Sequence, residues 1–334
     1  MKILFMGTPD FACESLKAIY EANYNIVGVV TNPDKPKGRG MKLQSSPVKE
    51  FALEKNIKIF QPIKIRNNEE FENEIKQLKP DIVCVVAYGK ILPQSFLDIP
   101  KYGCINVHGS LLPKYRGAAP IQRAVLNGDK ETGITTMFMD AGMDTGDMIL
   151  THKIEITPNE TTGELWDKMS ILGGKMLVKT LQLINEKISD GCADSFEELK
   201  EKVGAQKQGE DFSLAPMLSK EEASIDWNNY SAQQIHNLVR GLNPIMGAVT
   251  HSGNKTIKIW KTEIVDEQEL VELGINSNDY KIGQVVYANT KKGLIVKALE
   301  GYISILEIQP ENSKRLSFAE FINGQHVTEG YFFE

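Results

Sequence analysis

Cysteine is scarce in this chain of 334 residues. The four cysteines, at positions 13, 84, 104 and 192, form no C-x-x-C pair. A zinc ribbon and a disulfide scaffold are therefore excluded. Reduced thiols fit a cytoplasmic protein, and Cys84 and Cys104 lie in apolar runs that suit the core of a fold.

Long apolar segments are also missing. No stretch approaches the roughly 18 apolar residues that a membrane span requires. The apolar run after Met1 is too short for a signal peptide. We expect a protein that is neither exported nor inserted in a membrane.

An excess of positive charge is absent too. The formal net charge is −6, and residues 208–334 account for it with 11 basic and 17 acidic side chains. No large region is basic, so any contact with a nucleic acid must use a local patch. The apolar fraction of 41% and the charged fraction of 25% exclude disorder, collagen and coiled coil as descriptions of the whole chain.

Strand-like and helix-like segments alternate through the first half of the chain. Apolar runs predict strands at 3–6, 25–31, 57–60, 81–87, 103–107 and 133–139. Capping signals and helical spacing predict helices that begin near Thr8 and Pro9 and at 46–55, 69–78, 119–126 and 161–187. This alternation predicts an α/β fold with a doubly wound, mostly parallel, Rossmann-like sheet.

The pattern changes after residue 187. Residues 188–219 lack clear periodicity, which is typical of a linker, and short strands dominate beyond them around one helix at 232–242. We predict a first, catalytic domain at 1–189, a linker at 190–207, and a small OB-like β-barrel domain at 208–334.

Glycine motifs that bind nucleotides are absent. Gly7-Thr8-Pro9-Asp10 follows the first predicted strand, where a dinucleotide fingerprint would need G-x-G-x-x-G. Gly38-Arg39-Gly40 precedes no clear helix, and there is no P-loop. A NAD-dependent oxidoreductase is therefore disfavoured.

Two polar residues end the predicted strand at 103–107. Asn106 and His108 point to the same side of an extended chain, so an amide and an imidazole face one space. In open α/β sheets this carboxyl end is where ligands bind. From these residues alone, a histidine that merely caps the strand is an equally good interpretation.

A second loop, residues 139–147, contains three carboxylates and two glycines. It lacks the closing glutamate of a calcium loop, and Asp140 and Asp147 suit ordinary solvated positions. The sharper hypothesis is that one carboxylate meets His108, because an imidazole held by an acid beside an amide donor recurs in acyl transfer. The five histidines show no i, i+4 pairing, and we expect no metal.

Basic residues gather in the Gly- and Pro-rich loop at 33–42. They give a local charge of about +3 after Asp34 is subtracted, and they are Lys35, Lys37, Arg39 and Lys42. A solvated loop is the ordinary interpretation of such a run.

Four segments resemble the methionyl-tRNA formyltransferases, which belong to the enzymes that use 10-formyltetrahydrofolate. They are Gly7-Thr8-Pro9-Asp10-Phe11, residues 106–113 (NVHGSLLP), residues 116–122 (RGAAPIQ) and residues 139–146 (MDAGMDTG). The similarity covers nearly the whole chain. Residues 106–147 are shared by formyltransferases in general, whereas 116–122 and the loop at 33–40 point to the tRNA enzymes.

This resemblance implies transfer of the formyl group of 10-formyltetrahydrofolate to the α-amine of methionine on initiator methionyl-tRNA, for translation initiation. The family's catalytic residues fall on Asn106, His108 and Asp144. Its folate-contacting segment falls on Ser110, Leu111, Leu112 and Pro113. The basic loop would then contact tRNA, above all through Arg39.

Two departures from the family pattern stand out. Gly109 replaces the alanine of many relatives, and residues 243–248 lack an expected aromatic residue. The alternatives are another folate-dependent formyltransferase or hydrolase acting on an amino sugar or a nucleotide amine, and a non-catalytic nucleic-acid-binding protein. We expect a cytoplasmic monomer, because long apolar surface runs are absent.

Overall fold

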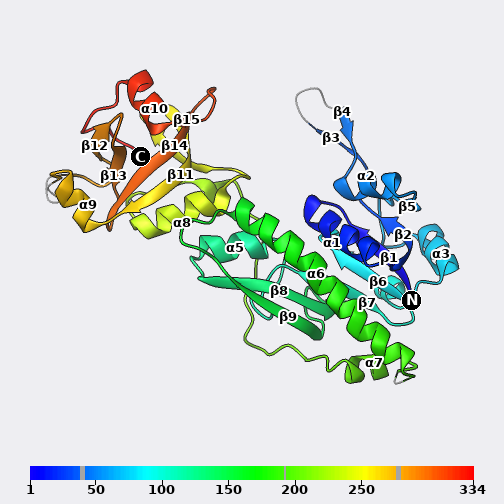
Figure 1. The fold of residues 1–334 in the computed structure, drawn as a ribbon. Coiled ribbons are helices and arrows are strands. Elements are labelled where there is room, and N and C mark those ends of the chain that lie inside the picture. Colours follow the sequence, from blue (N-terminus) through cyan, green and yellow to red (C-terminus); the bar gives the residue numbers. More distant parts are fainter. Residues whose placement is uncertain (38–41, 192, 276–279) are drawn as a thin grey trace. The chain divides into compact units, whose positions relative to one another are not determined.

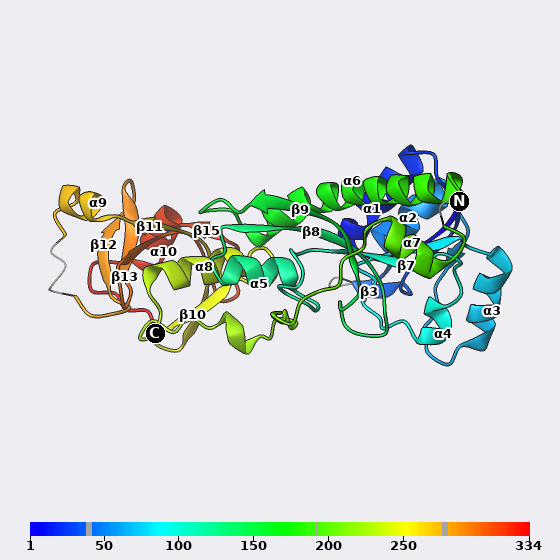
Figure 2. The same cartoon turned by 90° about the horizontal axis from the view of Figure 1, so that it is seen from below.

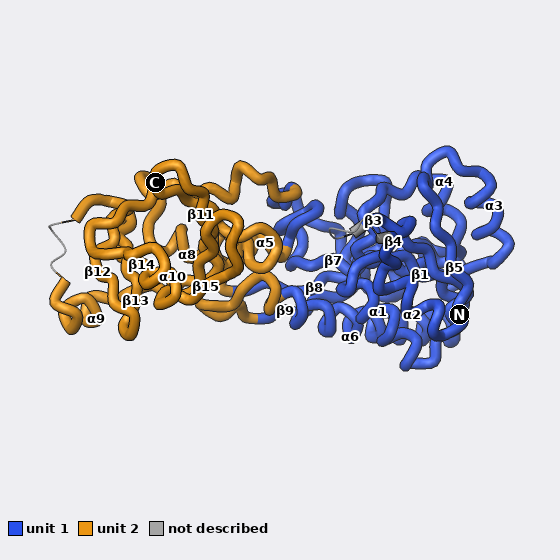
Figure 3. Tube along the Cα trace, turned by 90° about the horizontal axis from the view of Figure 1, so that it is seen from above, with its two compact units in different colours: residues 1–120, 131–154, 166–216 blue, residues 121–130, 155–165, 217–334 orange. Residues whose placement is uncertain are grey.

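The computed structural model describes residues 1–37, 42–191, 193–275 and 280–334 (Figure 1). The chain folds into two compact units, which Figure 3 shows in two colours. The first unit contains residues 1–120, 131–154 and 166–216, and the second contains 121–130, 155–165 and 217–334. Among the described residues, no helix is both long enough and apolar enough to cross a membrane.

A seven-stranded sheet forms the centre of the first unit. Its spatial order is β5 (Ile59–Phe60), β2 (Asn25–Val30), β1 (Lys2–Gly7), β6 (Ile82–Val86), β7 (Cys104–His108), β8 (Glu131–Phe138) and β9 (Met148–Glu155). The strands from β5 to β7 pair in parallel, and β8 runs antiparallel to β7. The predicted mostly parallel sheet is confirmed.

Helices cover both faces of this sheet, which is what doubly wound means (Figure 2). Side chains of α3 (Glu69–Leu78) and α4 (Gln94–Leu97) join Leu4, Met6, Val83 and Val85 in one apolar cluster. On the other face, α6 (Thr162–Ser189) lies against β7 and α1 (Asp10–Glu21), where Gly173 lets Val107 and Phe11 approach its backbone. Because β6 is covered from both sides, all five of its residues are buried.

Local signals explain where several of the helices begin. Ser46 caps α2 (Pro47–Glu54) by accepting a hydrogen bond from the backbone N–H of Lys49. Thr8 does not cap α1, which begins after Pro9 without a side-chain cap. The Thr8 hydroxyl instead accepts a 3.0 Å hydrogen bond from the side chain of Asn32, just beyond β2.

Several elements in this unit escaped sequence analysis. Among them are α4, β9, at the edge of the sheet, and α7 (Phe196–Lys202), inside the segment expected to be a linker. A capping box between Ser195 and Glu198 starts α7, and Leu199 is its only buried residue. One buried side chain in seven residues leaves no helical period to detect.

The second unit is built around an antiparallel sheet, as the sequence predicts for the C-terminal region. It contains β10 (Ala248–Ser252), β11 (Lys255–Val265), β14 (Tyr302–Pro310), β13 (Gly293–Lys297), β12 (Val285–Asn289) and the short β15 (Leu316–Ser317). The helices that accompany it are α5 (Pro120–Leu126), α8 (Ala232–Leu242), α9 (Glu267–Glu272) and α10 (Phe318–Gln325). Its apolar core includes Trp227, Ile235, Phe321 and Phe333.

Helix α8 also buries polar side chains. His236 is 3% exposed, with Nε2 3.1 Å from the carbonyl oxygen of Pro158 and Nδ1 3.0 Å from the hydroxyl of Thr262. Because a carbonyl only accepts, Nε2 donates and Nδ1 accepts from the hydroxyl, which is a neutral imidazole. Burial, with a smaller contribution from the cationic Arg240, lowers the pKa of His236.

The lowered pKa of His236 predicts a loss of stability in acid. Above the ordinary histidine pKa of about 6.5 the side chain is neutral in both the folded and the unfolded protein. As the pH falls below that value, the unfolded chain takes up a proton that the folded chain refuses, so stability declines. We expect the difference in thermal midpoint between wild type and His236→Gln to shrink between pH 8 and pH 5. A constant difference between the two midpoints would contradict this. The control is His251→Gln, which makes the same substitution at an exposed site.

Candidate active site

The predicted amide, imidazole and carboxylate come together at the carboxyl end of β7. Asn106 and His108 lie two residues apart on this strand, and Asp144 lies in the loop between β8 and β9. The Asn106 Nδ2 donates to Asp144 Oδ1 at 3.3 Å, and His108 Nδ1 lies 3.6 Å from the same oxygen. One carboxylate oxygen therefore faces both side chains of the strand.

The two nitrogens of His108 have different surroundings. Nε2 lies 2.8 Å from the backbone carbonyl oxygen of Tyr115, which can only accept, so Nε2 carries a hydrogen. Nδ1 faces Asp144. The His108 side chain is 6% exposed and that of Asp144 is 15% exposed, so their interaction is largely shielded from water.

Asp144 itself is held in an unusual backbone conformation. Its φ is +53°, in the left-handed region that non-glycine residues rarely occupy. Its second oxygen, Oδ2, accepts a 2.8 Å hydrogen bond from the backbone N–H of Gly117, whose φ of +125° favours glycine. Sequence reasoning missed the roles of Gly117 and of the Tyr115 carbonyl, because backbone groups carry no residue-type signal.

The expected folate-contacting segment is tied to β8. Thr135 Oγ1 donates to the carbonyl of Ser110 at 2.7 Å and accepts from the N–H of Leu112 at 3.1 Å. The hydroxyl of Ser110 donates to the carbonyl of Lys114 at 2.6 Å, and Ser110 is fully buried. The half-buried Leu111 and Pro113 are thus the side chains of this segment that retain exposed surface, whereas Leu112 is buried.

The other two acids of the loop stabilise it. Asp140 Oδ1 accepts from the N–H of Gly142 and from the hydroxyl of Thr145, at 2.9 and 2.6 Å. Asp147 forms a 3.0 Å ion pair with Lys200. Only Asp144 among the three lies against His108 and Asn106.

The described ends of the predicted basic loop pair as the two strands of a hairpin. Strand β3 (Lys35–Lys37) pairs antiparallel with β4 (Lys42–Gln44), and the side chain of Lys35 is exposed. Arg39 lies outside the described residues, as do the side chains of Lys37 and Lys42.

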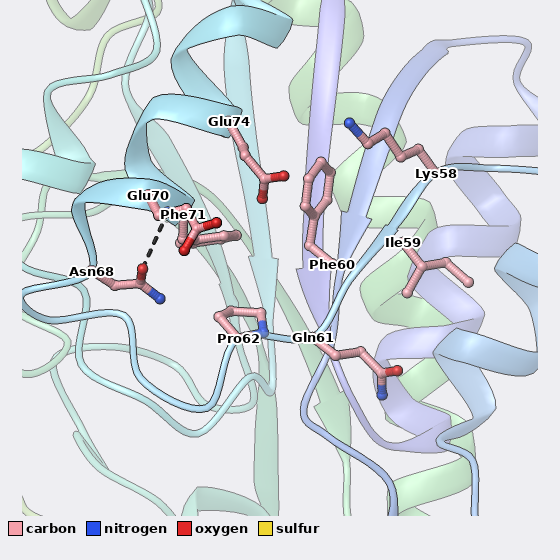
Figure 4. A pocket seen from close by; sticks show the side chains of 9 residues that line it. All are labelled: Lys58, Ile59, Phe60, Gln61, Pro62, Asn68, Glu70, Phe71 and Glu74. Atoms are coloured by element: carbon pink, nitrogen blue, oxygen red, sulfur yellow. Dashed lines mark hydrogen bonds between the residues drawn. The ribbon is translucent and has the colours of Figure 1, made fainter.

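A cavity of about 340 Å³ lies elsewhere on the first unit, between the end of β5 and α3 (Figure 4). None of the predicted site residues line it, and the Asn68 side chain at its edge caps α3 by accepting from the N–H of Phe71. Its lining residues are Lys58, Ile59, Phe60, Gln61, Pro62, Asn68, Glu70, Phe71 and Glu74. Within the described part of the chain, no group of three or more His, Cys, Asp or Glu side chains is placed to hold a metal ion.

Comparison with known proteins identifies the family of the chain. Residues 1–181 match the formyl transferase family, and residues 217–326 match the formyl transferase C-terminal domain. The chain belongs to this family, as its resemblance predicts.

Within this family, the curated relatives of high identity are methionyl-tRNA formyltransferases. A methionyl-tRNA formyltransferase of Clostridioides difficile is 46% identical over 330 residues, covering 99% of each chain. A methionyl-tRNA formyltransferase of Ruminiclostridium cellulolyticum is 47% identical over 330 residues, covering 99% of this chain and 98% of the relative. The N-formyltransferase from Helicobacter canadensis has a TM-score of 0.60 at 20% identity, covers 91% of this chain and 98% of its own, and shows the fold alone.

Gly146 is a sensitive point of the acidic loop. A Cβ atom at this buried position would overlap the carbonyl oxygen of Phe138, where β8 ends. We expect Gly146→Ala to lower the free energy of unfolding by about 1–3 kcal/mol, because overpacking forces the backbone to move. Urea unfolding measures the loss. Gly209→Ala is the control, since nothing lies within 4 Å of its added Cβ, and equal stabilities of the two variants would contradict the interpretation.

Proposed function

We propose that the chain transfers the formyl group of 10-formyltetrahydrofolate to the α-amine of methionine on initiator tRNA. The convergence of Asn106, His108 and Asp144 at one strand end carries this proposal, together with relatives matched over nearly their whole length. The reaction belongs to translation initiation, which places the enzyme in the cytoplasm. A monomeric state remains a prediction.

The chemistry requires donors that are in place before the charge develops. The neutral amine adds to the formyl carbon, a C–N bond forms, and negative charge collects on the formyl oxygen. Preorganised donors stabilise this oxyanion better than water, which would have to reorient. Asn106 supplies an amide N–H, and protonated His108 supplies a charged N–H at Nδ1.

Asp144 is placed to manage the positive charge and the proton. It pairs with the imidazolium of His108, and it accepts the proton that the attacking amine must lose. When the tetrahedral species collapses, the bond between the formyl carbon and the folate nitrogen breaks, and that nitrogen gains a proton. The sum is formyl transfer with no net proton change and no covalent intermediate on the enzyme.

The two substrates are assigned to different parts of the first unit. We place the folate donor against the segment Ser110–Pro113, where Leu111 and Pro113 keep exposed apolar surface. We place the acceptor end of tRNA at the basic hairpin, through Arg39 with Lys35, Lys37 and Lys42. Arginine suits this role because its planar guanidinium binds phosphate with two hydrogen bonds and stacks on bases.

Loss of a polar group at the centre should slow the reaction far more than it affects folding. Asn106→Ala and His108→Ala should each lower turnover by about 10²–10³-fold, the usual cost of removing one preorganised donor, and Asp144→Ala should lower it by about as much because the proton acceptor is lost. Initial rates of formyl transfer to methionyl-tRNA at saturating substrates measure this. Asp98→Ala, which removes an exposed carboxylate, is the control and should retain the wild-type rate. Near-normal turnover of His108→Ala would show the assignment to be wrong.

The hairpin assignment makes a separate prediction for tRNA. Arg39→Lys should raise the KM for methionyl-tRNA by roughly tenfold, because lysine keeps the charge but loses the two-pronged phosphate contact. The KM for the folate donor should not change. The control is Arg66→Lys, which makes the same change at an exposed position of the first unit. Equal rates of tRNA formylation by wild type and Arg39→Ala would refute this role.

A further inference from the structure

A segment outside both family matches runs along the candidate site. It spans residues 206–215, between the match that ends at 181 and the match that begins at 217. Its first end is fixed because the backbones of Gln206 and Met148 exchange two 2.8 Å hydrogen bonds. At its other end, the N–H of Arg116 donates to the carbonyl oxygen of Ser213 at 2.8 Å, and the N–H of Ala215 donates to the carbonyl oxygen of Arg116 at 2.7 Å.

Between these two anchors, the side chain of Gln208 reaches the acidic loop. Its Nε2 donates to the carbonyl oxygens of Asp144 and Gly146, each at 2.8 Å. Its Oε1 accepts a 2.9 Å hydrogen bond from Nε of Arg116. One amide thus connects the loop that carries Asp144 with the loop that presents the N–H of Gly117 to Asp144.

The backbone at Asp144 needs such support. A non-glycine residue in the left-handed region is strained and persists only where its surroundings hold it. The carboxylate depends on this backbone, because both its oxygens meet fixed partners: Gly117 on one side, and His108 with Asn106 on the other. A change of the Asp144 backbone out of the left-handed region would turn its Cα–Cβ bond and move the carboxylate away from these partners.

We infer that Gln208 is a positioning residue, which acts on formyl transfer by holding the Asp144 carboxylate between Gly117 and His108. The inference rests on the proposed function, since it assumes that Asp144 takes part in the reaction. The amide nitrogen of Gln208 donates to two carbonyls of the acidic loop, and its oxygen accepts from Arg116. These bonds tie the acidic loop to the backbone beside Gly117.

Two substitutions of Gln208 test its hydrogen bonds to the acidic loop and to Arg116. Gln208→Glu keeps an oxygen for Arg116 but removes both donors to the carbonyls of Asp144 and Gly146. Gln208→Met keeps the length of the side chain and removes donors and acceptor without adding charge. We expect both variants to lower kcat by about 10–10²-fold, the effect of a misplacement of about 1 Å at a reacting group. The KM values for methionyl-tRNA and for the folate donor should stay within about twofold of wild type.

The control is Gln206→Met, two residues earlier, where the side chain is exposed and the backbone carries the anchoring bonds. It should retain the wild-type kcat. If Gln208→Glu also has the wild-type kcat, the contact with Arg116 alone suffices and the inference is overturned.

A double-mutant cycle with Asp144→Ala tests whether Gln208 acts through Asp144. Where the carboxylate is already absent, Gln208→Met should lower the residual kcat by less than about threefold, because nothing is left to position. An equally large loss with and without Asp144 would show a general structural role and overturn the inference. Failure of the proposed function is distinct, since the wild-type protein would then transfer no formyl group to methionyl-tRNA, whereas a wild-type rate of Asp144→Ala would refute the role of Asp144 alone.

Discussion

The hydrogen bond from the Gly117 N–H to Asp144 Oδ2, at 2.8 Å, is the contact on which the geometry of the site depends. It fixes one oxygen of the carboxylate, so that the other is left facing His108 and Asn106. The strand supplies two rigid side chains, and the carboxylate has to be brought to them by a loop. Gln208 and Lys200 bind this loop from outside, and Asp140 binds the loop from within.

Several layers of the structure contribute to that placement. Strand β7 lies inside the sheet between β6 and β8, so Asn106 and His108 are supported by pairing on both edges. Thr135, opposite His108 on β8, ties down the segment that begins at Ser110. The backbone that carries these polar groups is thus held by strand pairing on both edges and by the contacts of Thr135.

The alternation of apolar runs and helical patterns was enough to predict the sheet and most helices of the first unit, because each run reflects burial on both faces. The strand-end position of Asn106 and His108, and a carboxylate among 139–147 that could meet them, were also predictable. The choice of Asp144 over Asp140 and Asp147 needed the family resemblance. The supporting contacts were not predictable, since a Gly117 N–H or a Tyr115 carbonyl has no sequence signature and Gln208 stands 64 residues from its partner.

The division of the chain into two units has a consequence for dissecting the enzyme into fragments. The first unit is assembled from three separate stretches, and its last stretch ends only at residue 216. A fragment that stops at residue 189 would keep Asn106, His108 and Asp144 but lose the stretch that pairs with Arg116 and Met148. Because residues 121–130 and 155–165 belong to the other unit, no single cut in the chain yields either half intact.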